Sequence, residues 1–190
     1  MDSAIAATLY CLLAAGVLAG WWREARKRAA AGGPEGFWPG TTGAPPAAHL
    51  AAASAMLLIT VGESVVEIRA GVSGSQSEMA AVSLFALLGA SVVEEAVFRG
   101  FAAPSWLTGV RLLGVMLAGS FIFAVIHGFS VTTAHGRISL TFAFVTSLGL
   151  YVARFNPLNP GRSLLPCFTA HFVRNIAVFG IKWAQGFVTW

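Results

Sequence analysis

Six long apolar stretches dominate the sequence and limit the folds open to it. Each is long enough, or nearly so, to cross roughly 30 Å of hydrocarbon as an α-helix. They run over residues 3–22, 47–68, 79–103, 111–132, 138–154 and 164–184. The chain is 56% hydrophobic and only 11% charged, whereas an ordinary soluble domain carries about 25% charged residues. We therefore predict an all-α fold, a polytopic transmembrane bundle with about six membrane-spanning helices.

The segments between these stretches do not mark off a second domain. A chain of 190 residues can form one helical bundle but leaves no room for a separate soluble domain, so we expect a single membrane domain over 1–190. Residues 23–46 are basic and then rich in glycine and proline, and residues 154–163 contain two prolines. Both segments are predicted to be surface loops. The fifth stretch is short and polar enough to be only half inserted.

The distribution of lysine and arginine predicts the orientation of the chain. With the N-terminus facing outward, eight of the twelve cationic side chains fall on the inner side and three on the outer side, as the positive-inside rule requires. The inner group comprises Arg23, Arg26, Lys27, Arg28, Arg99, Arg111, Arg154 and Arg162. The outer group comprises Arg69, Arg137 and Lys182, and Arg174 falls within the last stretch.

The same pattern indicates where the protein works and what it does not bind. The hydropathy is that of an integral protein of a cytoplasmic (inner) membrane, and we expect a prokaryotic one. No basic patch is interleaved with aromatic residues, so no nucleic-acid partner is expected. Cys11 and Cys167 both lie in apolar stretches, which argues against a disulfide framework. The oligomeric state is left open.

Two adjacent carboxylates, Glu94 and Glu95, interrupt the third apolar stretch. An ionisable side chain at membrane depth costs roughly 2.5–3.5 kcal/mol on insertion scales and by default marks a functional site. Glu95 and Arg99 are four residues apart, so they share one face of a helix and can form an ion pair. Glu94 points about 100° away on the same helix and has no evident local partner.

Two later stretches add polar side chains that lipid would also reject. The fourth carries His127, and the sixth carries His171 and Asn175, which lie on one helical face because they are four residues apart. The three helices satisfy these groups best by turning them towards one another. A carboxylate beside imidazoles and an amide can activate water, protonate a leaving amine and stabilise an oxyanion. The sequence therefore predicts a hydrolytic site.

The depth of the residues tests this prediction. In a simple up-and-down arrangement Glu94 lies in the inner half of its helix and His127 in the outer half of the next. At 1.5 Å per residue, the two would differ in depth by on the order of 10 Å. We expect the third helix to continue to about Ala103, with Pro104 opening the next segment, which reduces the difference.

At these residues the chain resembles a known family. The sequence Glu94 to Gly100 matches Glu-Glu-x-x-Phe-Arg-Gly; it is followed by Phe-x-x-x-His ending at His127 and by His-x-x-x-Asn from His171 to Asn175. These motifs, in this order, are similar to those of the CAAX protease and bacteriocin-processing family of glutamate-type intramembrane endopeptidases. The resemblance covers about residues 79–180, whereas many members of the family have about eight helices.

The resemblance implies a role for each matched residue. Glu94 would be the general base and His127 would share in activating water. His171 and Asn175 would lie at the oxyanion, with Glu95 and Arg99 in support. No metal or other cofactor is implied. The expected partner is a membrane-inserted or lipid-adjacent protein or peptide: a prenylated C-terminus, a leader peptide or a C-terminal sorting tail, to which the short chain would be suited.

Other interpretations of the same residues stay open. The glutamates and histidines could ligate zinc, although no His-Glu-x-x-His is present. Cys167 precedes His171 by four residues and could form a thiol–imidazole dyad. The polar groups could also form a proton relay in a proton-coupled transporter, or only lock the helices of a non-enzymatic scaffold.

Three charged residues outside the motifs remain to be placed. Glu63 and Glu67 are four residues apart on the second stretch. They either face the cavity or sit at the outer membrane interface beside Arg69, and we expect the interface. Arg174, at a variable position of the third motif, is expected to pair with a carboxylate or to reach towards a substrate terminus.

Overall fold

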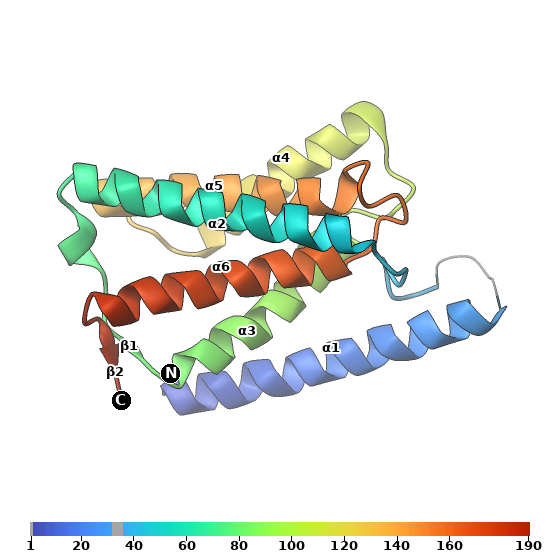
Figure 1. Cartoon of the computed structure of the whole chain (residues 1–190), viewed down its shortest axis with the longest axis horizontal. Coiled ribbons are helices and arrows are strands. Elements are labelled where there is room, and N and C mark those ends of the chain that lie inside the picture. The colour runs from blue at the N-terminus through green and yellow to red at the C-terminus, as the bar shows by residue number, and fades with distance from the viewer. Residues whose placement is uncertain (1, 32–35) are drawn as a thin grey trace.

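The computed structural model describes residues 2–31 and 36–190, which form six α-helices (Figure 1). The helices are α1 (Ser3–Ala31), α2 (Pro46–Arg69), α3 (Ser83–Glu94), α4 (Gly109–Ile126), α5 (Ala134–Phe155) and α6 (Leu165–Ala184). By length and composition, α1, α2, α4 and α5 can each cross a membrane. The predicted all-α membrane bundle is thus confirmed. The two other helices, α3 and α6, carry three of the six predicted site residues: Glu94, His171 and Asn175.

Two predicted boundaries are wrong because polar residues continue a helix. The segment from residue 23, predicted to be a loop, is helical up to Ala31, since its alanine, arginine, lysine and glutamate residues are good helix formers. Residues 32–35 of that predicted loop lie outside the described residues. The fifth stretch is also longer than predicted: α5 has 22 residues, and Ser139, Thr146 and Ser147 are buried in the bundle instead of shortening the helix.

The third stretch begins later than predicted and changes geometry near its end. Met79–Ala80, predicted to be helical, form a short strand β1 that pairs in parallel with β2 (Val188–Thr189). Beyond Glu94 the helix continues as the π-helix η2 (Glu95–Phe101), so the expected continuation towards Ala103 is confirmed to within two residues. Short π-helical segments are frequent at functional sites.

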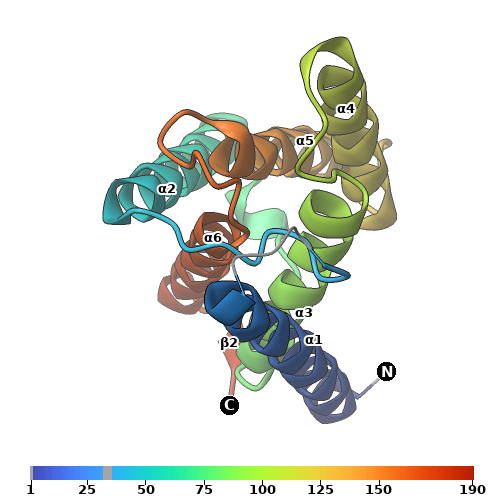
Figure 2. The same cartoon turned by 90° about the vertical axis from the view of Figure 1, so that its right-hand side faces the viewer.

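The helices are arranged in three tiers, with α3 and α6 in the middle. The packing runs α1 against α3, α2 against both α6 and α5, and α4 against α5 (Figures 1 and 2). The backbones of α3 and α1 come close together at Gly89, where a Cβ would lie 2.6 Å from the backbone of Tyr10. The helices α3 and α6 each have a face that packs against other helices, and this face can carry polar and charged groups. Both chain termini lie at the same end of the bundle (Figure 1).

Candidate active site

Glu94 and Glu95 lie where α3 passes into η2, and their surroundings differ. The side chain of Glu95 is completely buried, whereas that of Glu94 is 26% exposed. Successive side chains on a helix point about 100° apart, so only one of the two carboxylates can face the protein interior. The structure turns Glu95 inward and leaves Glu94 towards a cavity.

Glu95 is held by a cation and an imidazole. Nη1 of Arg99 donates a hydrogen bond to Glu95 Oε1 over 3.1 Å, and Nδ1 of His171 donates to the same oxygen over 2.7 Å. The predicted Glu95–Arg99 pair is thus present, with both side chains fully buried. A buried charge is tolerated when it is paired and hydrogen-bonded, and Glu95 meets this condition through two different helices.

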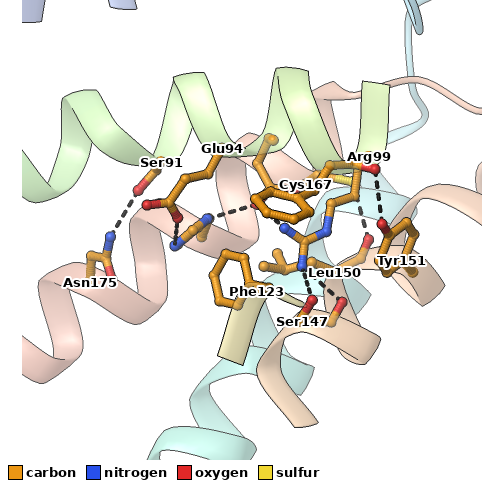
Figure 3. A network of polar contacts seen from close by, with 12 residues as sticks. Ser91, Glu94, Arg99, Phe123, Ser147, Leu150, Tyr151, Cys167 and Asn175 are labelled. Carbon is orange, nitrogen blue, oxygen red and sulfur yellow. Dashed lines mark hydrogen bonds and ion pairs between the residues drawn. The ribbon is translucent and has the colours of Figure 1, made fainter. Parts of the chain in front are cut away.

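Arg99 extends the network to α5. Its Nη2 donates to the backbone carbonyl of Ser147 over 3.0 Å and to the Ser147 hydroxyl over 2.6 Å. The guanidinium carbon lies 4.8 Å from the ring centre of Phe123 and 4.9 Å from that of Tyr151, within the range of cation–π attraction. Figure 3 shows Arg99 enclosed by these side chains. Arg99 is therefore part of the packed interior, away from the cavity.

His171 connects the two carboxylates. While its Nδ1 bonds to Glu95, its Nε2 lies 3.7 Å from Oε2 of Glu94. The hydrogen bond to Glu95 fixes the tautomer and the ring orientation, because an imidazole nitrogen that donates must carry the proton. Its other nitrogen is thereby directed at Glu94.

Asn175, one turn further along α6, ties this helix to α3. Its amide nitrogen donates to the backbone carbonyl of Leu87 over 3.1 Å and to the hydroxyl of Ser91 over 2.8 Å (Figure 3). A side-chain amide nitrogen carries two hydrogens, and both are directed at α3. Asn175 also lines the cavity next to Glu94.

His127 follows the last residue of α4 and approaches the site from the opposite side. Its Nδ1 donates to the Phe123 carbonyl over 2.6 Å, and its ring stacks on Phe129 with the planes 15° apart. With the proton on Nδ1, the lone pair on Nε2 is available to accept a hydrogen bond.

These side chains surround one cavity of about 80 Å³. Its lining includes Glu94, His127, His171, Asn175 and Arg174. The predicted difference in depth between Glu94 and His127 is therefore overcome, and four of the six predicted site residues line a common space. The other two, Glu95 and Arg99, lie behind it. A polar cavity of this size has room for several water molecules.

Several residues of the site were not predicted from the sequence. Ser91, Ser147 and Tyr151 support the motif residues, and Tyr151 donates to the backbone carbonyl of Phe98 over 2.9 Å. Serine and threonine residues in the fifth stretch were read as a sign of partial insertion. Two of them, Thr146 and Ser147, accept hydrogen bonds from Arg174 and Arg99 on neighbouring helices. Polar residues within an apolar stretch were the signal that the sequence contained.

Glu63 and Glu67 face the interior and line a cavity, which is the alternative to the expected position at the membrane interface. Glu63 accepts a hydrogen bond from Nη2 of Arg174 over 2.9 Å, and Arg174 also donates from Nε to Thr146. Both glutamates line a second cavity of about 240 Å³. Arg174 thus pairs with a carboxylate, which confirms one of the two expectations for this residue. The direction in which Glu63 and Glu67 point depends on the rotation of α2, which its neighbours set.

The thiol alternative finds no support in the geometry. Cys167 is fully buried, its thiol is directed at the Leu150 carbonyl over 3.3 Å, and both ring nitrogens of His171 face carboxylates. For the zinc alternative, residues 2–31 and 36–190 contain no group of three or more His, Cys, Asp or Glu side chains arranged to hold a metal ion.

Comparison with known proteins identifies the family. A family model described as Rce1-like, type II CAAX prenyl endopeptidase, matches residues 76–177. The chain belongs to this Rce1-like family. The match covers α3, η2, α4, α5 and most of α6, with all six predicted site residues. No curated protein and no solved structure matches the chain. As a family member, the chain is an integral membrane protease, a CAAX-type intramembrane endopeptidase at the level of the family.

Proposed function

We propose that the chain is a glutamate-type intramembrane endopeptidase in which Glu94 is the general base. The observation that carries the proposal is the contrast between the two adjacent carboxylates. Glu95 is fully buried and bonded to Arg99 and His171, whereas Glu94 is partly exposed and lines the cavity. Adjacent carboxylates in different environments commonly have different roles in catalysis. Glu94 is the one that a water molecule can reach.

The proposed reaction is hydrolysis of a peptide bond by water held in the cavity. Glu94 accepts a proton from the water as its oxygen attacks the carbonyl carbon of the substrate. The tetrahedral intermediate then collapses, the carbon–nitrogen bond breaks, and Glu94 returns the proton to the leaving nitrogen. The products are a carboxylic acid and an amine, and Glu94 is again a carboxylate. General acid–base catalysis of this kind contributes about 10²–10⁴-fold to the rate.

The neighbouring residues have supporting roles in this mechanism. His127 accepts a hydrogen bond from the water at Nε2, because its Nδ1 proton is engaged by Phe123. His171 presents Nε2 towards the reacting atoms, and Glu95 and Arg99 hold its ring in place. Asn175 keeps α6 against α3, so we assign it a positioning role instead of a direct contact with the oxyanion.

The proposed substrate is a membrane-inserted or lipid-adjacent protein segment, and the proposed location is the cytoplasmic membrane of a prokaryote. The cavity lies between α3, α4, α5 and α6, of which α4 and α5 are apolar enough to face lipid. A substrate that reaches this site therefore approaches through or beside the bilayer. C-terminal sorting tails are the first class to test.

The decisive experiment measures cleavage of a panel of C-terminal-tail substrates by the purified protein in liposomes. We expect Glu94→Gln to lower the cleavage rate by about 10²–10⁴-fold without unfolding the protein. Glu78→Gln is the matched control, since Glu78 is exposed and lies outside the cavities, and it should leave the rate unchanged. A folded Glu94→Gln variant that cleaves at the normal rate would contradict the proposal.

Two further arms of the same assay separate the alternatives. Inhibition by a chelator would favour the zinc mechanism. Loss of cleavage in Cys167→Ala, with Glu94→Gln still active, would favour the thiol mechanism. A glutamate-type enzyme retains its activity in the presence of chelator and in Cys167→Ala.

A further inference from the structure

The cavity around Glu94 is closed at one end of the bundle by a layer of buried side chains. Arg99 and Tyr151 belong to this layer and contact each other. Beyond them, Arg154 donates from Nη1 to the backbone carbonyl of Ala103 over 2.6 Å and from Nε to that of Arg162 over 2.9 Å. Arg99, Tyr151 and Arg154 are completely buried. Neither water nor substrate has a path to Glu94 through this layer.

At its other end the Glu94 cavity adjoins the second cavity. Phe129 and Arg174 line both spaces, so the two cavities are neighbours. The second cavity is three times the volume of the first, about 240 against 80 Å³. It lies among the last turns of α2 and α6, the first turn of α5 and the segment before β1, which meet at the end of the bundle where both termini lie (Figure 1).

Most of the side chains that line the second cavity are polar or charged, beside Met79, Phe129, Val178 and Ile181. The polar and charged side chains are Thr60, Glu63, Ser64, Glu67, Gln76, Ser77, His135, Ser139, Arg174 and Lys182. Several are bonded within the cavity: Glu63 to Arg174, Glu67 to Gln76, and Lys182 to the Ser77 carbonyl. A space lined in this way holds water and suits an extended, hydrated peptide better than an apolar helix.

The distribution of charge identifies the membrane face to which this cavity belongs. The basic last turns of α1, with Arg23, Arg26, Lys27 and Arg28, lie at the opposite end of the bundle from the two termini (Figure 1). The positive-inside rule places that basic end in the cytoplasm. The second cavity then opens at the extracytoplasmic face.

We infer that water and substrate reach Glu94 from the extracytoplasmic face, through the second cavity. The enzyme then cleaves protein segments that are presented at that face beside a membrane anchor, and the polar residues next to the cleaved bond occupy the second cavity. This inference rests on the proposed role of Glu94, since it takes the Glu94 cavity as the place of hydrolysis. It adds the side of access and the chemical character of the substrate segment.

Cysteine labelling of the full chain in intact cells tests the side of access. In a Cys11→Ala background, with the buried Cys167 retained, Ser77→Cys reports on the cavity end and Thr108→Cys on the opposite end. We expect a membrane-impermeant thiol reagent to label Ser77→Cys in intact cells and Thr108→Cys only after permeabilisation. The reverse pattern would overturn the inference. Labelling requires no catalysis, so its outcome is independent of the Glu94→Gln assay.

A second pair of variants tests whether the cavity contains water. Ser64 and Val65 are neighbours on α2 and lie at the same depth, but only Ser64 lines the cavity. Thiols react as thiolates, which form in water and not in lipid. The external reagent should label Ser64→Cys and spare Val65→Cys. Equal protection of the two would overturn the proposed route.

The substrate arm uses a tail from the panel fused to a reporter on the extracytoplasmic side of its anchor. Release of the reporter outside the cell by wild type and not by Glu94→Gln is expected. Reversing the charges that flank the anchor inverts the fusion and should abolish its cleavage. Cleavage of the inverted fusion alone would overturn the inference.

Discussion

Arg99 and Arg174 each pair with a glutamate inside the bundle, yet the two pairs lie in different surroundings. The Arg99–Glu95 pair has no exposed side-chain surface, and a serine and two aromatic rings complete its contacts. In the Arg174–Glu63 pair the side chains are 16% and 14% exposed; both line the second cavity, and Arg174 also lines the Glu94 cavity. The same kind of ion pair is thus fully enclosed at one end of the site and lines a cavity at the other.

The largest expected effect comes from breaking the dry pair. In Arg99→Met the carboxylate of Glu95 stays buried with only His171 as a partner, and removing one member of a buried pair costs about 3–5 kcal/mol. We expect the free energy of unfolding in detergent micelles to fall by that amount. Arg111→Met is the control, since Arg111 is exposed, and should change stability by less than about 0.5 kcal/mol. Equal effects of the two substitutions would show that the buried pair does not stabilise the fold.

A smaller effect is expected from separating α1 and α3, the contact that keeps α3 in the middle of the bundle. A Cβ at Gly89 would lie 2.6 Å from the backbone of Tyr10, which cannot move aside as a side chain can. We expect Gly89→Ala to destabilise the protein by about 1–3 kcal/mol. A Cβ at Gly114 of α4 meets no atom within 4 Å, so Gly114→Ala should be close to neutral. Thermal unfolding of the two variants measures the difference.

The smallest effect is expected at the hydrated pair. A double-mutant cycle with Glu63→Gln and Arg174→Gln should give a coupling energy of about 1 kcal/mol, near the upper end for solvated pairs. This coupling should weaken as the salt concentration rises, because water in the second cavity admits counterions. The corresponding coupling between Glu95 and Arg99 should not respond to salt. Salt-independent coupling in both pairs would indicate that the second cavity is dry.

The sequence was informative where the interactions are local. Helix periodicity alone paired Glu95 with Arg99 and singled out Glu94, and the structure has both features. Apolar length predicted the six helices, with α6 within one residue at its start. These features depend on residues a few positions apart on one helix, so the sequence contains the information that determines them.

Other features depend on how the helices are rotated against one another, and the sequence did not reveal them. Three such contacts are His171 with Glu95, Arg99 with Ser147, and Arg174 with Glu63. They join residues that are 48 to 111 positions apart in the sequence. The pairing of β1 with β2 spans a similarly long interval, from Met79 to Val188. No periodicity within one segment specifies such contacts.

The sequence by itself determined that this chain is a helical membrane protein with carboxylates, imidazoles and an amide at membrane depth. Hydrophobicity and helical spacing are properties of each segment, so they can be recognised from the order of its residues alone. Which polar groups are enclosed behind the site and which line its cavities depends on the tertiary structure. The reason is that the burial of each polar side chain is set jointly by α2, α3, α5 and α6 when these helices pack together.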